Sequence, residues 1–153
     1  MNPTELRDFI HAHRQLVLAV SQNDEPFTAM SAYVPEPDVR GLLIHLSNLS
    51  LHKRVLAQNP RCSLLIAEPD DGRAEVMSLA RMTLQGVAAT IDKASADYTQ
   101  AKALFLARLP TSELMFGLPD FDLIRITINS GRYIAGFGKA FPFTTEELAA
   151  DVY

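Results

Sequence analysis

Short apolar runs recur along this chain, and each of them ends at a turn or at a helical segment. Runs of this length, rich in branched apolar residues, are typical of strands. Seven of them are predicted to be strands: 16–20, 27–34, 42–46, 62–67, 82–91, 121–128 and 132–137. Because turns join the runs near both ends of the chain and helical segments lie between them, the pattern predicts a mainly antiparallel β-barrel with peripheral helices.

Turn residues predict how neighbouring strands connect. Residues 23–26, Asn-Asp-Glu-Pro, predict a hairpin between the first two strands. Residues 129–131, Asn-Ser-Gly, predict a second hairpin between the last two, in which Gly131 provides a positive φ. Gly86 lies inside the fifth strand, where it predicts a β-bulge or a close approach of another backbone.

Capping residues predict the starts of four helices, at Asn2, Ser50, Asp92 and Thr144. The last of these, over residues 144–152, has the most complete signal. Thr144 and Glu147 have the spacing of a capping box, and Phe143 and Leu148 have that of a hydrophobic staple. We expect this terminal helix to dock on the barrel or on a partner subunit.

Composition limits the classes of function. The chain has 153 residues, 48% of them hydrophobic, which is enough for one domain, 1–153, with its own core. A net charge of -4 and the absence of a basic run argue against nucleic acid as a partner. No apolar run approaches membrane-spanning length and the first residues do not resemble a secretory signal, so we expect a cytoplasmic protein without a membrane partner. No histidine or cysteine pair has metal-ligand spacing, so no metal site is predicted.

One segment carries a predicted anion site. Residues 44–54 pass from a strand end into a helix whose first turn holds three basic side chains, His52, Lys53 and Arg54. The helix dipole makes this the unfavourable end for cations, and a bound anion removes the conflict. A phosphate held by the first-turn N–H groups, the Ser47 and Ser50 hydroxyls and one or two of these cations is one interpretation. The other is that Lys53 and Arg54 extend into solvent and Ser50 is only a cap.

Two other polar groups have simpler interpretations. His45 lies in an apolar strand, where it faces either a pocket or a partner subunit, or forms part of a hydrogen-bonded core. Asp120 and Asp122 are two residues apart on a strand and face the same side, but the turn after Pro119 accounts for Asp120 without catalysis.

Three segments resemble the superfamily of pyridoxamine 5'-phosphate oxidase. Leu42–Glu68 is similar to its strand-helix-strand core, and Arg81–Gly86 to the strand that follows. Gly131–Ala140 resembles the ending of the heme-utilisation branch of that superfamily. The resemblance implies a split β-barrel of the FMN-binding type that forms a homodimer.

The resemblance also implies site residues. The positions that face the FMN phosphate in the oxidases correspond to Leu51 and His52, and the neighbouring strand positions to His45 and Leu46. The oxidases have an Arg-Lys pair at the first two positions, so Leu51 is a departure for which Lys53 is a candidate replacement. Arg81 stands where the oxidases contact the flavin and where the heme branch has an arginine facing its pocket. The predicted cofactor-binding set is therefore His45, Leu46, Ser47, Ser50, His52, Lys53 and Arg81.

We therefore expect an FMN-binding protein, a flavin-dependent oxidoreductase of a small-molecule substrate, in which the isoalloxazine performs the chemistry and no catalytic side chain is assigned. The arginine and histidine with which the oxidases bind pyridoxine have no counterpart after Arg132, which argues against vitamin B6 oxidation. One alternative is a heme-binding protein of heme utilisation, with Arg81 beside a propionate and a histidine such as His45 approaching the iron, because the C-terminal histidine that the resemblance implies as iron ligand has no counterpart after His52. Another is a cofactor-free dimeric carrier or interaction module.

Overall fold

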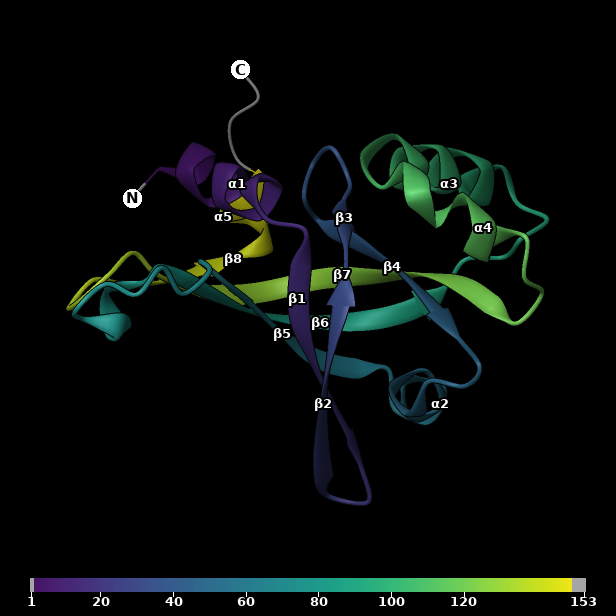
Figure 1. Ribbon diagram of the computed structural model, residues 1–153, viewed down its shortest axis with the longest axis horizontal. Coiled ribbons are helices and arrows are strands. Elements are labelled where there is room, and N and C mark those ends of the chain that lie inside the picture. Colours follow the sequence, from purple (N-terminus) through teal and green to yellow (C-terminus); the bar gives the residue numbers. More distant parts are fainter. Residues whose placement is uncertain (1, 150–153) are drawn as a thin grey trace.

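The computed structural model describes residues 2–149, whose strands form one curled antiparallel sheet (Figure 1). Its order is β2-β1-β5-β6-β7-β4-β3, and β8 pairs with β7. The strands are β1 (Gln15–Gln22), β2 (Glu25–Ala32), β3 (Val34–Pro35), β4 (Gly41–Ser47), β5 (Arg61–Ala67), β6 (Arg81–Thr90), β7 (Phe121–Ile134) and β8 (Ala140–Thr144). This mainly β architecture with few helices confirms the predicted split β-barrel.

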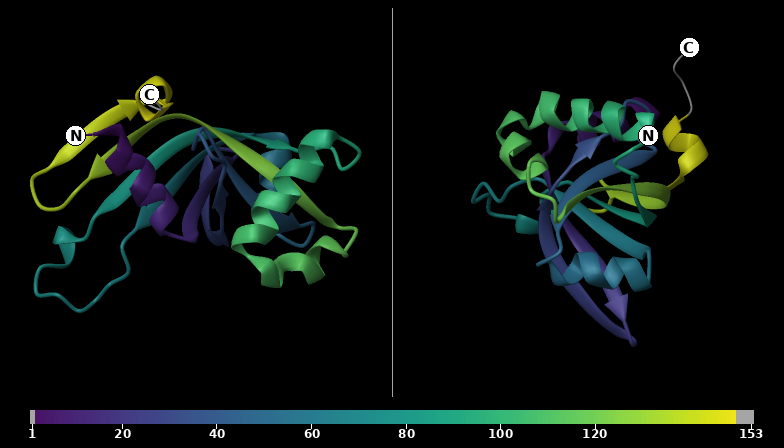
Figure 2. Two further views of the ribbon diagram at one scale, coloured as in Figure 1. Left: turned by 90° about the horizontal axis from the view of Figure 1, so that it is seen from above. Right: turned by 90° about the vertical axis from the view of Figure 1, so that its right-hand side faces the viewer.

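Helices cover the two ends of the sheet. They are α1 (Pro3–Ala12), α2 (Leu51–Gln58), α3 (Ala96–Arg108), α4 (Glu113–Phe116) and α5 (Thr145–Ala149), with short 3-10 helices η1 (Val76–Ser78) and η2 (Pro110–Ser112). Helices α1 and α5 lie together at one end, and α3 and α4 at the other (Figures 1 and 2).

Alternation along the strands divides the apolar residues between two cores. The inward positions of β1, β4, β5, β6 and β7 form the main core, which α1, α2 and α5 close. The outward residues Leu43 and Leu123 belong to a second cluster, with Ala101 and Phe105 of α3. The outer face of β4 and β7 is therefore covered by α3, whereas that of β1, β2 and β5 is not.

An ion network fastens α3 to the sheet. Arg125 of β7 bonds Asp97 at the start of α3, with both distances 2.7 Å, and also Glu36 at 2.5 and 3.1 Å. Gly41 makes room for this arrangement, because a Cβ there would lie 2.1 Å from Glu36 Oε1. The position of α3 follows from charge as well as from apolar packing.

The first predicted hairpin is present. Gln22 pairs with Glu25, and the two residues between them, Asn23 and Asp24, both have positive φ, as a type I′ turn requires. Pro26 is tolerated because β2 is the edge strand of the sheet.

The predicted hairpin at residues 129–131 is wrong. β7 continues without a turn through these residues to Ile134. The register with β6 shifts instead: Gly86 pairs with Ile128 and Gln85 with Ser130, so Asn129 is an unpaired bulge residue and the irregularity predicted at Gly86 is confirmed. Gly131 does not have a positive φ; a Cβ there would lie 2.4 Å from Phe143 Cζ and 2.8 Å from Leu84 Cδ2.

The real hairpin joins β7 to β8, a strand that the sequence patterns did not predict. Its turn contains Gly136 and Gly138, both with positive φ. The predicted capping box of the last helix is present, with Thr144 N bonded to Glu147 Oε2 at 2.8 Å. Leu148 of α5 is fully buried, and residues 150–152 of the predicted helix lie outside the described residues.

Candidate functional site

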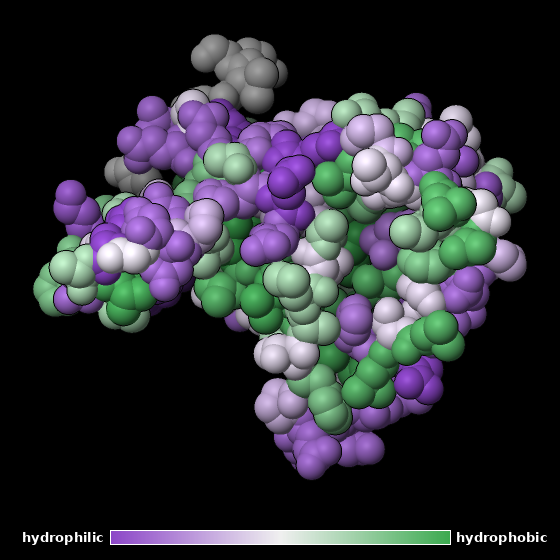
Figure 3. Space-filling view, viewed as in Figure 1, coloured by the Kyte–Doolittle hydropathy of each residue, from purple (hydrophilic) through white to green (hydrophobic). Residues whose placement is uncertain are grey.

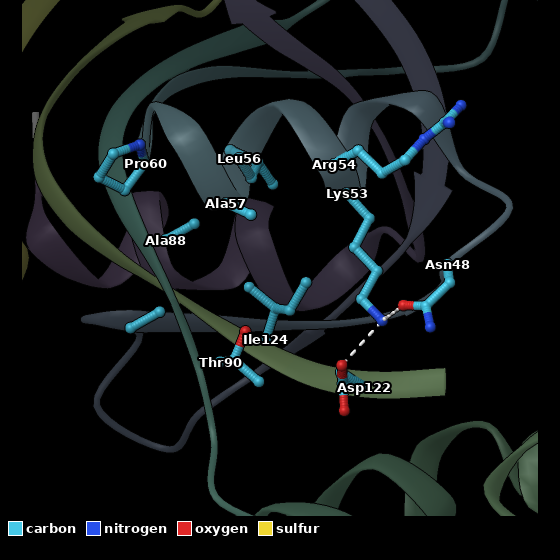
Figure 4. Close-up of a pocket in the computed structure, with 11 residues that line it drawn as sticks. Asn48, Lys53, Arg54, Leu56, Ala57, Pro60, Ala88, Thr90, Asp122 and Ile124 are labelled. Carbon is cyan, nitrogen blue, oxygen red and sulfur yellow. Dashed lines mark hydrogen bonds and ion pairs between the residues drawn. The ribbon is translucent and has the colours of Figure 1, made fainter. Parts of the chain in front are cut away.

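Lys53 lies at the centre of a cluster of polar contacts, called the knot below, that links two loops to α2. Its ammonium is 2.8 Å from Asp122 Oδ2 and donates to Asn48 Oδ1 at 2.5 Å and to the Asp120 carbonyl at 3.0 Å (Figure 4). The side chain is only 10% exposed. An ammonium has three donors, and all three have protein acceptors here. Lys53 therefore has no hydrogen left for a bound phosphate.

Asp122 is the charge partner of Lys53. Lys93 Nζ lies 3.6 Å from its other oxygen and donates to the Pro119 carbonyl. Burial alone would raise the pKa of Asp122, but the bonds and charges of the two lysines outweigh it and lower that pKa. The knot thus joins the connections that follow β4, β6 and α4.

A groove of about 520 Å³ runs beside the knot, between α2 and the ends of β6 and β7 (Figure 4). Its floor is mostly apolar, and its polar end is formed by the knot. The lining residues are Asn48, Lys53, Arg54, Leu56, Ala57, Pro60, Ala88, Ala89, Thr90, Asp122 and Ile124. Arg54 points away from Lys53 and Asp122, and within residues 2–149 nothing bonds its guanidinium.

His45 is enclosed by aromatic rings on the outer face of β4. Its imidazole stacks on Phe116 of α4 with centroids 3.9 Å apart and planes at 14°, and it lies tilted against Phe105 and Phe121. Its Nε2 atom is buried and has no hydrogen-bond partner among the described residues. Burial is the main cause that lowers its pKa to about 4; Lys93 adds to the shift and Asp122 opposes it. The ring is therefore neutral at pH 7.

This lowered pKa predicts acid sensitivity. An unfolded histidine with a pKa of 6.5 takes up a proton that folded His45 resists, so unfolding becomes easier as the pH falls from 6.5 to about 4. We expect His45 to account for a loss of about 1 to 2 kcal/mol, after discounting for its partial exposure. Urea unfolding at pH 7 and pH 4.5 should show a smaller loss for His45→Phe, which keeps a ring in the stack. Equal losses in both proteins would contradict the assignment.

The other residues predicted beside the phosphate are not all gathered at one place. Ser47 donates to Asp120 Oδ2 at 2.9 Å and accepts from Leu49 N, so its hydroxyl belongs to the knot. Ser50 is the N-cap of α2, as predicted, but its side chain makes no cap bond. The Leu46 side chain lies in the main core, 6% exposed. His52 has a buried Nε2 that bonds none of the residues 2–149, and burial lowers its pKa.

Arg81 lies at the far end of the sheet from the knot. It pairs with Ile134 at the start of β6, whereas Thr90, which lines the groove, ends the same strand. Nine residues of strand separate the two ends by about 30 Å. The Arg81 guanidinium donates to the Met77 and Leu79 carbonyls. One chain therefore does not bring Arg81 and the knot to the same ligand.

Sequence reasoning missed the acceptors that occupy Lys53. The sequence predicts Asp120 and Asp122 as a same-face pair, but it does not predict their contacts with a lysine almost seventy residues earlier in the chain. The pairing of β4 with β7, in which Leu46 lies opposite Asp122, makes the contact. A lysine that is buried next to a strand end almost always has an acidic partner, so a predicted burial of Lys53 would have indicated one.

The family described as pyridoxamine 5'-phosphate oxidase matches residues 3–135. The chain belongs to this family.

Two similar proteins are named as heme oxygenases. Heme oxygenase HutZ of Vibrio cholerae is 26% identical over 153 residues, which cover 97% of this chain and 85% of that protein. The chloroplastic non-canonical heme oxygenase HOZ of Arabidopsis thaliana is 33% identical over 113 residues, 71% of this chain but 33% of that protein. The predicted similarity to the heme-utilisation branch is thereby confirmed.

Solved structures show the same fold. A heme binding protein from Mycobacterium smegmatis superposes with a TM-score of 0.86 at 23% identity, over 97% of this chain and 60% of that one. Campylobacter jejuni ChuZ gives a TM-score of 0.83 at 20% identity, over 94% of this chain and 59% of that one. The chain thus spans about 60% of the length of these two proteins.

The described residues contain neither a helix suited to crossing a membrane nor a group of side chains suited to holding a metal ion. None of the helices within 2–149 has the length and hydropathy needed to cross a membrane. In the same part of the chain, no three or more His, Cys, Asp or Glu side chains are grouped so that they could hold a metal ion.

Proposed function

We propose that this protein binds heme as a homodimer and serves heme utilisation. The observation that carries the proposal is the full occupation of Lys53. FMN brings a phosphate that needs free donors and positive charge. Leu51 stands where the oxidases have a cation, and the three donors of Lys53 are taken by Asn48, Asp120 and Asp122. A phosphate here would also face the Asp122 carboxylate, so these residues do not fit FMN.

The surface near His45 fits a flat apolar macrocycle better. Apolar surface gathers over α4 and along the β4–α2 connection, on either side of a hollow (Figure 3). Five large apolar side chains in or directly next to these two segments are exposed: Leu49 89%, Leu114 74%, Leu51 46%, Leu118 43% and Met115 38%. Exposed apolar residues gathered in this way mark a binding surface. The Nε2 atom of His45, which is buried and bonds no residue in the described part of the chain, is a nitrogen of the kind that binds heme iron.

Dimerisation would complete the site. If Arg81 pairs with a heme propionate, as the resemblance implies, a second copy must supply it, because the Arg81 of the same chain is about 30 Å away along β6. The uncovered outer face of the sheet suits such a contact. Met30, Val17 and Leu65 are cross-strand neighbours there and are 69%, 37% and 38% exposed. The outward residues of β1 and β2 are all uncharged.

Heme titration followed by sedimentation tests the proposal. We expect a saturable Soret band and a species of two chains. Leu65→Lys places a charge in the uncovered sheet face, so it should yield monomers that bind heme at least about tenfold more weakly. Gln100→Asp, at an exposed position of α3, is the control and should leave both properties unchanged.

Two outcomes would overturn parts of this account. A wild-type protein that shows no Soret band at stoichiometric heme does not bind heme. A Leu65→Lys monomer with unchanged heme affinity would show that one chain holds the complete site and that Arg81 of the partner subunit is not needed.

A further inference from the structure

The outward strand positions that α3 leaves open carry only positive charge, although the protein as a whole is acidic, with a net charge of -4. Side chains alternate between the two faces along each strand, so the register fixes which residues point outward. On β1, β2, β5, β6, β8 and the part of β7 after the bulge, the outward positions hold no Asp or Glu. The charged residues among them are Arg61, Arg81 and Arg132. A face of this kind attracts an anion.

Two of these arginines are neighbours on the face. Arg81 lies opposite Ile134, and Arg132 lies opposite Thr83, two residues further along β6. Diagonal neighbours of this kind are within reach of each other when their side chains are long. Met82, the next residue after Arg81, is fully buried in the main core, so both arginines point to the other side of the sheet. The pair therefore presents two guanidinium groups together.

Both guanidinium groups have free donors. The Nη1 atom of Arg81 donates to the Met77 and Leu79 carbonyls, which hold the side chain in place and leave its Nη2 and Nε atoms without a partner among residues 2–149. Arg132 is exposed, and no residue in the described part of the chain bonds its guanidinium. A guanidinium binds a carboxylate with two parallel hydrogen bonds. Two such groups side by side suit a ligand with two carboxylates.

Exposed apolar side chains border the arginine pair. Val76 and Met77 in η1 are each 51% exposed, and Phe137, in the turn after β7, is 80% exposed. The two segments lie side by side at one end of the sheet, where a Cβ added to Gly136 would be 3.4 Å from the Ser78 carbonyl oxygen (Figure 1). Apolar surface next to cationic groups fits a ligand that is apolar but carries anionic groups on one edge.

We propose that Arg81 and Arg132 together bind the two carboxylates of the porphyrin, and that this pair selects ligands in which both carboxylates are free. The inference rests on the proposed heme-binding function and names the residues that recognise one edge of the ligand. A porphyrin of this class is a flat apolar ring with both carboxylates on the same edge. Because Arg81 lies about 30 Å along β6 from the end beside the knot, the pair of one copy serves the porphyrin held against the partner copy.

Porphyrin binding by a variant of Arg132 tests the pair. Arg132→Gln should unfold at the same denaturant concentration as the wild type, because no described residue bonds this side chain. It should bind metal-free protoporphyrin IX about 10- to 100-fold more weakly, measured by porphyrin fluorescence. This ligand contains no iron, so its affinity reports the carboxylate contacts independently of any axial ligand. Arg61→Gln is the matched control: it removes the same charge from the same face, about 20 Å from Arg81, and should bind like the wild type.

The dimethyl ester of protoporphyrin IX separates a direct contact from a general effect of charge. Esterification should weaken binding to the wild type, and this loss should be about 10- to 100-fold smaller in Arg132→Gln. Equal losses in the two proteins, or an unchanged affinity of Arg132→Gln for the free diacid, would overturn the arginine pair while the heme-binding function stands. A wild type that takes up neither heme nor protoporphyrin IX would overturn both.

Discussion

Replacement of Lys53 by methionine is expected to destabilise the protein by about 2 to 4 kcal/mol. Breaking a buried ion pair from one side leaves the other charge unpaired, and here the Asp122 carboxylate, the Asn48 amide oxygen and the Asp120 carbonyl all lose their donor. We expect a destabilisation in the lower part of this range because the Asp122 side chain is 32% exposed. Urea or thermal unfolding of the protein without added cofactor measures it.

Arg54→Met is the matched control for Lys53→Met. It removes a cation from the next position of α2, where the guanidinium is exposed and no described residue bonds it, so the change should stay within about 0.5 kcal/mol. Lys53→Met could instead unfold at the same denaturant concentration as the wild type but lose affinity for FMN. In that case Lys53 would be a free phosphate ligand, and its contacts in the knot would be absent from the protein in solution.

Replacement of Gly131 by asparagine should destabilise the fold by about 2 to 3 kcal/mol. The side chain would start at a Cβ that lies 2.4 Å from Phe143 Cζ and 2.8 Å from Leu84 Cδ2, inside the main core. Overpacking of this kind displaces core side chains or the backbone. A hairpin turn with positive φ at this position would instead accept asparagine readily, so the substitution separates the two structures.

Gly138→Asn is the control for Gly131→Asn. Gly138 has a φ of +77° and nothing within 4 Å of an added Cβ, which is the environment that asparagine tolerates. Its effect should stay below about 1 kcal/mol. Comparable unfolding midpoints for the two variants would place the turn at Gly131, against the long β7 strand.

The sequence predicted most of the strands because their apolar alternation is local. The type I′ turn at Asn23 and Asp24 and the capping box at Thr144 and Glu147 are also encoded within four residues. The second hairpin was misplaced because Asn-Ser-Gly has turn chemistry, whereas the glycine is required by a ring twelve residues later, Phe143. Contacts of that range leave no periodic signal in the sequence.

The candidate site was less predictable than the fold. Resemblance drew attention to the β4–α2 segment, but spacing alone did not show that Asp122 neutralises Lys53, because the contact depends on the pairing of β4 with β7. In the same way, the apolar strand around His45 gave no sign of Phe116, whose position depends on how α3 and α4 fold back over the sheet. For both Lys53 and His45, the sequence identifies the residue but not its partner, because the partner is distant in the chain.

Parallel titrations of the purified protein with FMN and with heme, each followed by absorbance to stoichiometric concentration, test the central claim most directly. We predict a saturating Soret band with heme and no perturbation of the flavin spectrum with FMN, because Lys53 has no free donor and Leu51 carries no charge. Stoichiometric FMN binding without a Soret response to heme would contradict the claim and restore the flavin oxidoreductase interpretation.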